Sequence, residues 1–156
     1  MMLFSRLLRL DSDLNPVYGD LAKEWTQSDD GMQYTFTLHE GVKWHDGEPV
    51  TLDDLVFAYE VICHKDYQGL RYGESEINVV GVEEYHAGTA DKISGLELSE
   101  DEMTLTIHFK EFYPSILVGG FWTNPLPRHY YGDIPVKDMA AHEKTRTKPL
   151  GYGAFK

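Results

Sequence analysis

Residues 34–64 predict a strand, a turn and a helix in succession, and this pattern constrains the fold of the chain more than any other feature. Apolar and polar residues alternate over residues 34–39, which is typical of a half-buried strand. Gly41 ends the alternation, and Asp46 with Gly47 predicts a tight turn. A strand of this kind must cover its apolar face, so the chain needs a packed sheet.

The predicted helix begins at about Leu52 and ends at about His64. Thr51 is a good N-cap, and Asp53 and Asp54 favour the positive end of the helix dipole. Apolar residues recur along the helix at helical spacing. This apolar stripe needs a partner, and we expect it to pack on the sheet.

The rest of the chain predicts further short strands and helices, without an internal repeat. A β-hairpin is expected from strands at 96–98 and 103–109, because one face of the second strand is apolar and the other is polar. Residues 77–82 are β-like, and residues 85–89 predict a helical turn that Gly88 ends. Short helices are expected at 114–118, 128–131 and 136–143, before an extended segment at 148–155. The expected fold class is mixed α/β (α+β), with small mixed sheets and short packed helices.

The charge balance excludes several classes of partner. The 156 residues include 14 basic and 26 acidic side chains, which gives a net charge of −12. A nucleic-acid binder needs a basic face, and so does a protein that adheres to anionic lipid, so neither is expected. The acidic charge either keeps a secreted or surface protein soluble or attracts cationic ligands.

No catalytic or metal-binding pattern stands out, and no cofactor is predicted. Cys63 is the only cysteine and is expected to act as a small buried hydrophobe. His39 and His45 could meet across a turn, but no third metal ligand has suitable spacing. His45 beside Asp46 could suggest acid–base chemistry, although an exposed turn neighbour is the simpler interpretation. Arginines at positions 6 and 9 interrupt the apolar N-terminal stretch, so no export signal is predicted in this chain.

An aromatic loop supplies the candidate ligand-binding residues Phe121, Trp122, Thr123 and Asn124. Aromatic rings beside hydroxyl and amide groups can line a cleft, where they stack on a ligand and form hydrogen bonds with it. The alternative is that the two aromatic residues cover the core beneath the 114–118 helix.

The segment 34–60, YTFTLHEGVKWHDGEPVTLDDLVFAYE, resembles the signature of the family 5 extracellular solute-binding proteins. The family pattern is a strand ending in F-x-L-R-x-G, then V-K-W-x-D-G, then P-V-T-x-x-D and a helix. His39 departs from it, since the family has arginine there. Residues 3–25, 80–88 and 149–156 resemble other family segments in the same order. The residues that match the central pattern are Phe36, Leu38, Gly41, Val42, Lys43, Trp44, Asp46, Gly47, Pro49, Val50, Thr51 and Asp54.

The resemblance implies a piece of a two-lobed protein that closes on its ligand, with a periplasmic-binding-protein type II-like lobe. Residues 1–33 would begin lobe I, residues 34–148 would form the smaller N-terminal subdomain, and residues 149–156 would cross back toward lobe I. Gly151 and Gly153 would lie at or near this crossover. Six of the matched residues would be structural and form a folding signature rather than a ligand site. These signature residues are Trp44, Asp46, Gly47, Pro49, Thr51 and Asp54.

The function that the resemblance implies is capture of oligopeptides or dipeptides outside the cytoplasmic membrane for the permease subunits of an ABC importer. The location would be periplasmic or lipid-anchored at the cell surface, and no enzymatic activity is expected. Two alternatives stay open. One is a structural or interaction lobe without its own ligand, and the other is a binding protein for nickel, haem or a sugar.

Overall fold

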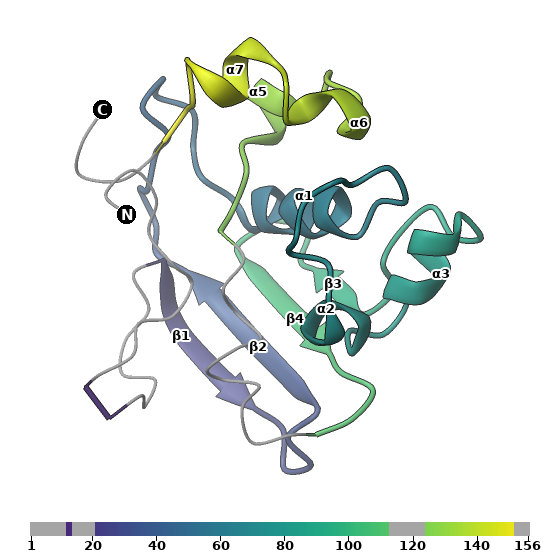
Figure 1. The fold of residues 1–156 in the computed structure, drawn as a ribbon. Helices are drawn as coiled ribbons and strands as arrows, with labels where there is room; N and C mark the ends of the chain where they lie inside the picture. The colour runs from purple at the N-terminus through teal and green to yellow at the C-terminus, as the bar shows by residue number, and fades with distance from the viewer. Residues whose placement is uncertain (1–11, 14–20, 113–123, 152–156) are drawn as a thin grey trace.

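One antiparallel sheet organises the structure, a computed structural model that describes residues 12–13, 21–112 and 124–151. Its strands are β1 (Ala22–Gln27), β2 (Gln33–Leu38), β3 (Leu96–Leu98) and β4 (Thr104–His108), in the order β1-β2-β4-β3 (Figure 1). Each neighbouring pair is antiparallel, where small mixed sheets were expected. The predicted strand at 34–39 and the predicted hairpin are confirmed as β2 and as β3 with β4.

The sheet has one apolar face and one polar face, as the period-two patterns predict. Tyr34 and Phe36 of β2 and Ile107 of β4 are at most 1% exposed and belong to the main core. Thr35 and Thr106 lie directly opposite each other, and their hydroxyls are 3.0 Å apart. The alternation therefore places every second residue of these strands in the core.

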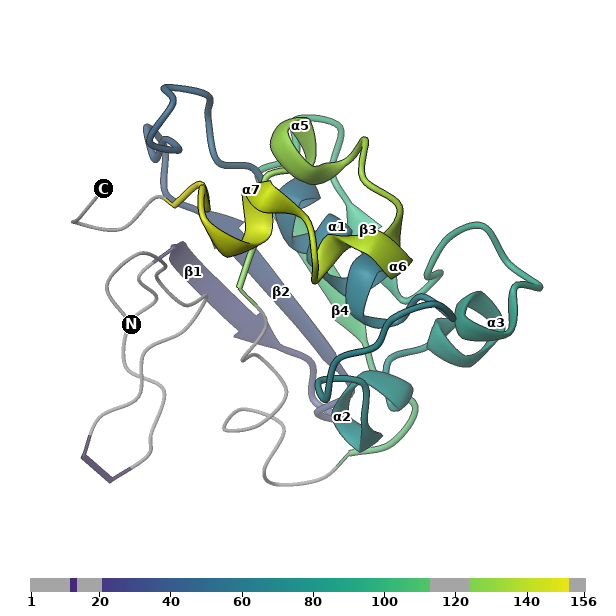
Figure 2. The same ribbon diagram turned by 45° about the horizontal axis from the view of Figure 1, so that its top comes forward.

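Helix α1 (Leu52–Ile62) covers the apolar face of the sheet (Figures 1 and 2). Thr51 is its N-cap, which confirms the predicted start. The helix ends at Ile62, two residues before the predicted end. Leu55 and Tyr59 pack into the sheet core, whereas Phe57 and Val61 belong to a second apolar cluster. Because α1 is apolar on two sides, it is the central layer between the sheet and further helices.

The remaining helices are short and lie on two sides of α1. The helices α2 (Glu74–Ile77) and α3 (Val82–Ala87) precede the hairpin, whereas α5 (Arg128–Tyr131), α6 (Val136–Met139) and α7 (Glu143–Arg146) follow it. Figure 2 shows that α5, α6 and α7 pack over α1 on the side away from the sheet. The predicted helix at 136–143 is therefore two separate helical turns. In the part of the chain that the structure describes, no helix has the length and apolar character to cross a bilayer.

The β-like prediction for residues 77–82 is wrong. Helix α2 ends at Ile77, and the only β contact in this stretch is an isolated bridge between Val79 and Phe109. Gly81 adopts a φ of +85°, which breaks an extended path and leads directly into α3. The predicted turn at 85–89 belongs to α3, which ends at Gly88 as expected. The predicted helix at 114–118 lies outside the described residues.

Candidate functional site

Two signature residues, Trp44 and Thr51, donate hydrogen bonds to one buried carboxylate, that of Asp54 in the first turn of α1. Its side chain is 5% exposed and accepts three hydrogen bonds. Oδ2 accepts from the indole Nε1 of Trp44 at 2.9 Å and from the backbone N–H of Thr51 at 3.2 Å. Oδ1 accepts from the backbone N–H of Arg128 at 3.0 Å. A buried charge is tolerated when it is hydrogen-bonded in this way, so Asp54 joins the turn, α1 and α5.

The turn before α1 places Trp44 in the core. The side chain is 2% exposed and packs in the main apolar cluster. The backbone N–H of Gly47 donates to the carbonyl of Trp44, and Gly47 has a φ of +96°, which favours glycine. Pro49 is exposed and forms a bridge with Lys43 that closes the turn. The turn therefore orients Trp44 toward Asp54.

Arg128 fastens α5 to the outer side of α1. Its guanidinium donates to Asp53 at 2.7 and 3.2 Å and pairs with Glu60 at 3.0 Å. Its Cζ also lies 4.9 Å from the centre of the Phe57 ring. Burial alone would lower the pKa of Arg128, but the hydrogen bonds and charges of the two carboxylates raise it above its ordinary value. The first turn of α1 thus holds α5 through two adjacent aspartates.

The segment 148–151, which leads toward the expected crossover, is held by α5 and by the Trp44 turn. Tyr130 donates its hydroxyl hydrogen to the carbonyl of Lys148 at 2.8 Å. The hydroxyl of Tyr131 accepts from the backbone N–H of Leu150 at 3.3 Å. The backbone N–H of His45 donates to the carbonyl of Gly151 at 2.8 Å, and Gly151 is buried. His45 therefore serves as a backbone anchor, a role that the sequence did not predict.

Helix α5 also contacts the turn before α1, through His129 and Asp46. The imidazole Nε2 lies 2.7 Å from Oδ2 of Asp46. Burial works to raise the pKa of Asp46, but the hydrogen bonds from His129 and from the backbone of Glu48 lower it overall. Asp46 thus does more than form a turn, because it also positions α5.

Of the four candidate ligand-binding residues, only Asn124 lies in the described part of the chain. Its Oδ1 is buried and has no hydrogen-bond partner among the described residues. Phe121, Trp122, Thr123 and Gly153 fall outside the described residues.

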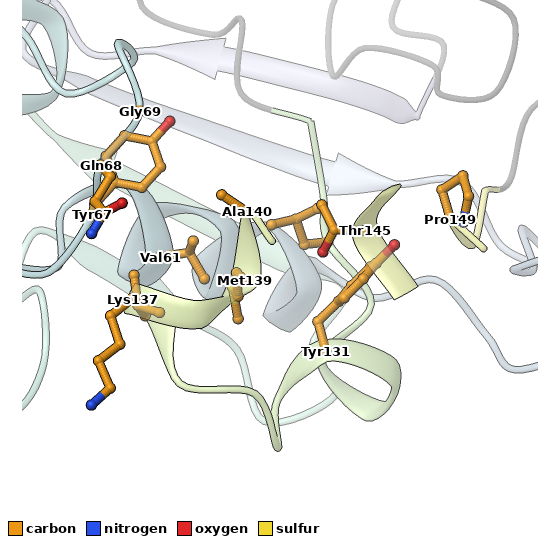
Figure 3. Close-up of a pocket in the computed structure, with 12 residues that line it drawn as sticks. Val61, Tyr67, Gln68, Gly69, Tyr131, Lys137, Met139, Ala140, Thr145 and Pro149 are labelled. Atoms are coloured by element: carbon orange, nitrogen blue, oxygen red, sulfur yellow. The ribbon is translucent and has the colours of Figure 1, made fainter. Parts of the chain in front are cut away.

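An apolar pocket of about 440 Å³ lies between α1, the loop at 67–69 and the helices α5, α6 and α7 (Figure 3). We call it the helical pocket. The sequence did not predict it, because its walls come from two parts of the chain, residues 61–69 and 126–149, that are far apart in the sequence. Residues that line it include Val61, Tyr67, Leu126, Tyr131, Val136 and Met139.

The histidines and Cys63 do not form a reactive or metal-binding cluster in the described ranges. No group of three or more His, Cys, Asp or Glu side chains there could hold a metal ion. Cys63 is fully buried, and burial, followed by the charge of Glu76, raises the pKa of its thiol to about 12. The expectation that Cys63 acts as a small hydrophobe is confirmed.

Comparisons with known proteins agree with this arrangement. The oligopeptide-binding protein OppA of Lactococcus lactis subsp. cremoris is 39% identical over 127 residues, which are 78% of this chain and 21% of that protein. The oligopeptide-binding protein AppA of Bacillus subtilis is 34% identical over 158 residues, which are 99% of this chain and 26% of that protein. The chain thus spans about a quarter of the length of the curated relatives it matches.

The fold is also that of solved peptide-binding proteins. The structure of lactococcal OppA complexed with an endogenous peptide in the closed conformation matches with a TM-score of 0.88 and 34% identity, over 97% of this chain and 29% of that one. The mixed α/β fold class is therefore confirmed, and the structural neighbours are two-lobed periplasmic binding proteins. The sequence pattern described as "Bacterial extracellular solute-binding proteins, family 5 Middle" matches residues 16–156. The chain belongs to the family 5 bacterial extracellular solute-binding proteins.

Proposed function

We propose that the protein of which this chain is part captures oligopeptides outside the cytoplasmic membrane and delivers them to the permease subunits of an ABC importer. The observation that carries the proposal is the likeness, over almost the whole chain, to a lactococcal protein that was solved with a peptide bound. The names of the relatives support oligopeptides over other solutes. The proposed role is binding and not catalysis, which is consistent with the structural use of Asp46, Asp54 and His129 described above.

This chain would supply part of one of two lobes that close on the peptide. We propose that residues 1–33 begin lobe I, that residues 34–148 form the smaller subdomain and that residues 149–156 cross back toward lobe I. β1 lies within the first of these segments yet pairs with β2, so the sheet joins the two. Such pairing would fix the subdomain rigidly to the start of lobe I.

The proposed crossover would begin from a fixed point. Gly151 is anchored by His45, and the adjacent Leu150 is held by Tyr131, so the segment up to position 151 moves with the subdomain. We propose Gly151 and Gly153 as the crossover residues. Asn124, whose buried oxygen has no partner among the described residues, stays a proposed ligand-binding residue together with Phe121, Trp122 and Thr123.

The test is calorimetry with pools of synthetic oligopeptides, carried out on the whole protein and on the 156-residue chain alone. The whole protein is expected to bind with a Kd of about 1 μM or below, because both lobes contribute hydrogen bonds. The isolated chain is expected to bind weakly or not at all, because it lacks the opposing lobe. Sub-micromolar binding by the isolated chain would contradict the proposal that both lobes are needed to hold the peptide. Absence of binding by the whole protein would refute the proposed function.

A further inference from the structure

The helical pocket is built to receive an apolar group. Its volume of about 440 Å³ lies in the usual range for a binding pocket, and its walls are mainly aliphatic and aromatic. Tyr131 lines the pocket, and its hydroxyl already has two hydrogen-bond partners. It accepts from the backbone N–H of Leu150 and donates to the carbonyl of Lys144 at 3.4 Å. Polar atoms make up only a small part of the lining, so a polar group that entered the pocket would gain little for the hydration it lost, and an apolar occupant is favoured.

Apolar surface continues outside the pocket along the neighbouring loop. Gly69 lines the pocket, and the next residue, Leu70, is completely exposed (relative exposure 103%). A single exposed leucine is common on protein surfaces, but Leu70 directly adjoins the pocket and so extends its apolar surface. A small molecule that filled the pocket would leave Leu70 uncovered, whereas a polypeptide chain could cover both.

The segment that carries α5–α7 has more basic than acidic side chains, on a chain that is otherwise strongly acidic, although Arg128 is paired with Asp53 and Glu60 of α1. Residues 128–148 contain five basic and three acidic side chains, whereas the rest of the chain contains nine basic and 23 acidic ones. Lys137 of α6 is exposed at the pocket, and Figure 3 shows its ammonium pointing away from the cavity. Arg146 of α7 is also exposed, and neither residue has an ion pair within the described ranges. Cations on two helices beside one pocket complement an acidic partner.

We propose that the helical pocket is a docking site for another polypeptide chain, which inserts one or two apolar side chains flanked by acidic residues. The apolar side chains fill the space between Val61 and Met139, and the flanking carboxylates meet Lys137 and Arg146. Met139 suits such a site because its flexible thioether side chain adapts to the shape of its partner. This site is additional to the proposed capture of peptides between two lobes.

The test is a titration of the ¹⁵N-labelled 156-residue chain, followed by NMR chemical shifts. The probe is an acetylated and amidated octapeptide with a Leu-Phe-Leu centre between glutamates and aspartates, and the control peptide carries lysines in place of the acidic residues. The acidic peptide is expected to shift the amide signals of Val61, Val136, Met139 and Ala140 with a Kd of about 0.1–1 mM. The lysine peptide is expected to bind at least about 10-fold more weakly, and the difference should shrink at high salt.

Two pairs of variants separate the pocket from its charged rim. Ala140→Trp fills the pocket and should abolish the shifts, whereas Ala87→Trp, at an exposed position on α3, should not. Lys137→Gln should weaken binding about 3-fold, whereas Lys92→Gln, on an exposed loop, should leave it unchanged. If Ala140→Trp does not fold, the lysine pair still decides the outcome.

Four results would overturn the proposal. The acidic peptide could produce no shifts at about 1 mM, or it could shift residues away from the pocket. The lysine peptide could bind equally well, which would remove the argument from charge. The pocket residues could shift with protein concentration alone, which would assign the site to a second copy of this chain. Laurate could bind in the pocket where the peptide does not, which would assign the site to a small amphiphile.

Discussion

Replacing Asp54 by asparagine tests the buried carboxylate that accepts hydrogen bonds from Trp44, Thr51 and Arg128. The side chain keeps its size, but its amide has one acceptor oxygen for the three donors that now surround the carboxylate, from Trp44, Thr51 and Arg128. If the amide oxygen faces Trp44, the amide nitrogen faces the backbone N–H of Arg128. That donor then becomes unsatisfied in a buried position.

The expected loss follows from these bonds. A hydrogen bond to a charged acceptor contributes about 1.5–3 kcal/mol, and an unsatisfied buried donor costs about 1–3 kcal/mol. Since the effects overlap, we expect Asp54→Asn to lower the free energy of unfolding by about 2–4 kcal/mol, a large part of the total for a domain of this size. The assay is urea unfolding followed by far-UV circular dichroism, with Asp91→Asn on an exposed loop as the control, expected within about 0.5 kcal/mol of wild type.

A double-mutant cycle with Trp44→Phe sharpens the test. Phenylalanine removes the indole donor, so Asp54→Asn should cost about 1 kcal/mol less in that background than alone. The reasoning is refuted if Asp54→Asn costs less than about 0.5 kcal/mol, or if the two changes are additive.

Three further predictions address the turn, α5 and the buried thiol. The pKa of Asp46 is lower in the folded protein than its ordinary value of 3.8, so the Asp46 carboxylate stabilises the fold at pH values above 3.8. This contribution is lost as the pH falls through the lower folded-state pKa. Asp46→Asn and His129→Ala should therefore flatten the loss of stability below pH 3.8 in urea titrations, and parallel curves would contradict this. Gly47→Ala should destabilise by about 1 kcal/mol or more because φ is +96°, whereas Gly73→Ala at a φ of −157° should not; equal unfolding midpoints would refute this. Cys63 should react with a water-soluble disulfide reagent only after unfolding, because it is fully buried with a pKa of about 12; rapid reaction of the native protein would disprove its burial.

Elements with strong local patterns were predictable from the sequence. The alternation in β2 and β4, and Thr51 before the apolar stripe of α1, each point to one structure, and the structure follows them. The central motif also identified the family, because it combines a strand, a glycine turn and a capped helix in a fixed order.

Elements without a distinct pattern were missed or misassigned. β1 is an edge strand in which Lys23, Glu24 and Gln27 are all exposed, so it shows little alternation. Residues 77–82 look like a strand by composition, yet the only β bridge there is at Val79, and the chain turns at Gly81.

The contacts that build the candidate site could not have been found from local patterns. Asp54 and Arg128 are 74 residues apart, and Asp46 and His129 are 83 residues apart, so no spacing rule joins them. The helical pocket depends in the same way on two distant segments, residues 61–69 and 126–149. Long-range pairing of this kind requires the tertiary structure.

Native mass spectrometry of the whole protein, purified without denaturation, shows whether that protein holds peptides. We expect added masses that denaturation releases and that sequencing identifies as oligopeptides of varied composition. An added synthetic oligopeptide should exchange with them. A protein that carries no peptide and takes up none from an excess of mixed oligopeptides would refute the proposed capture of peptides.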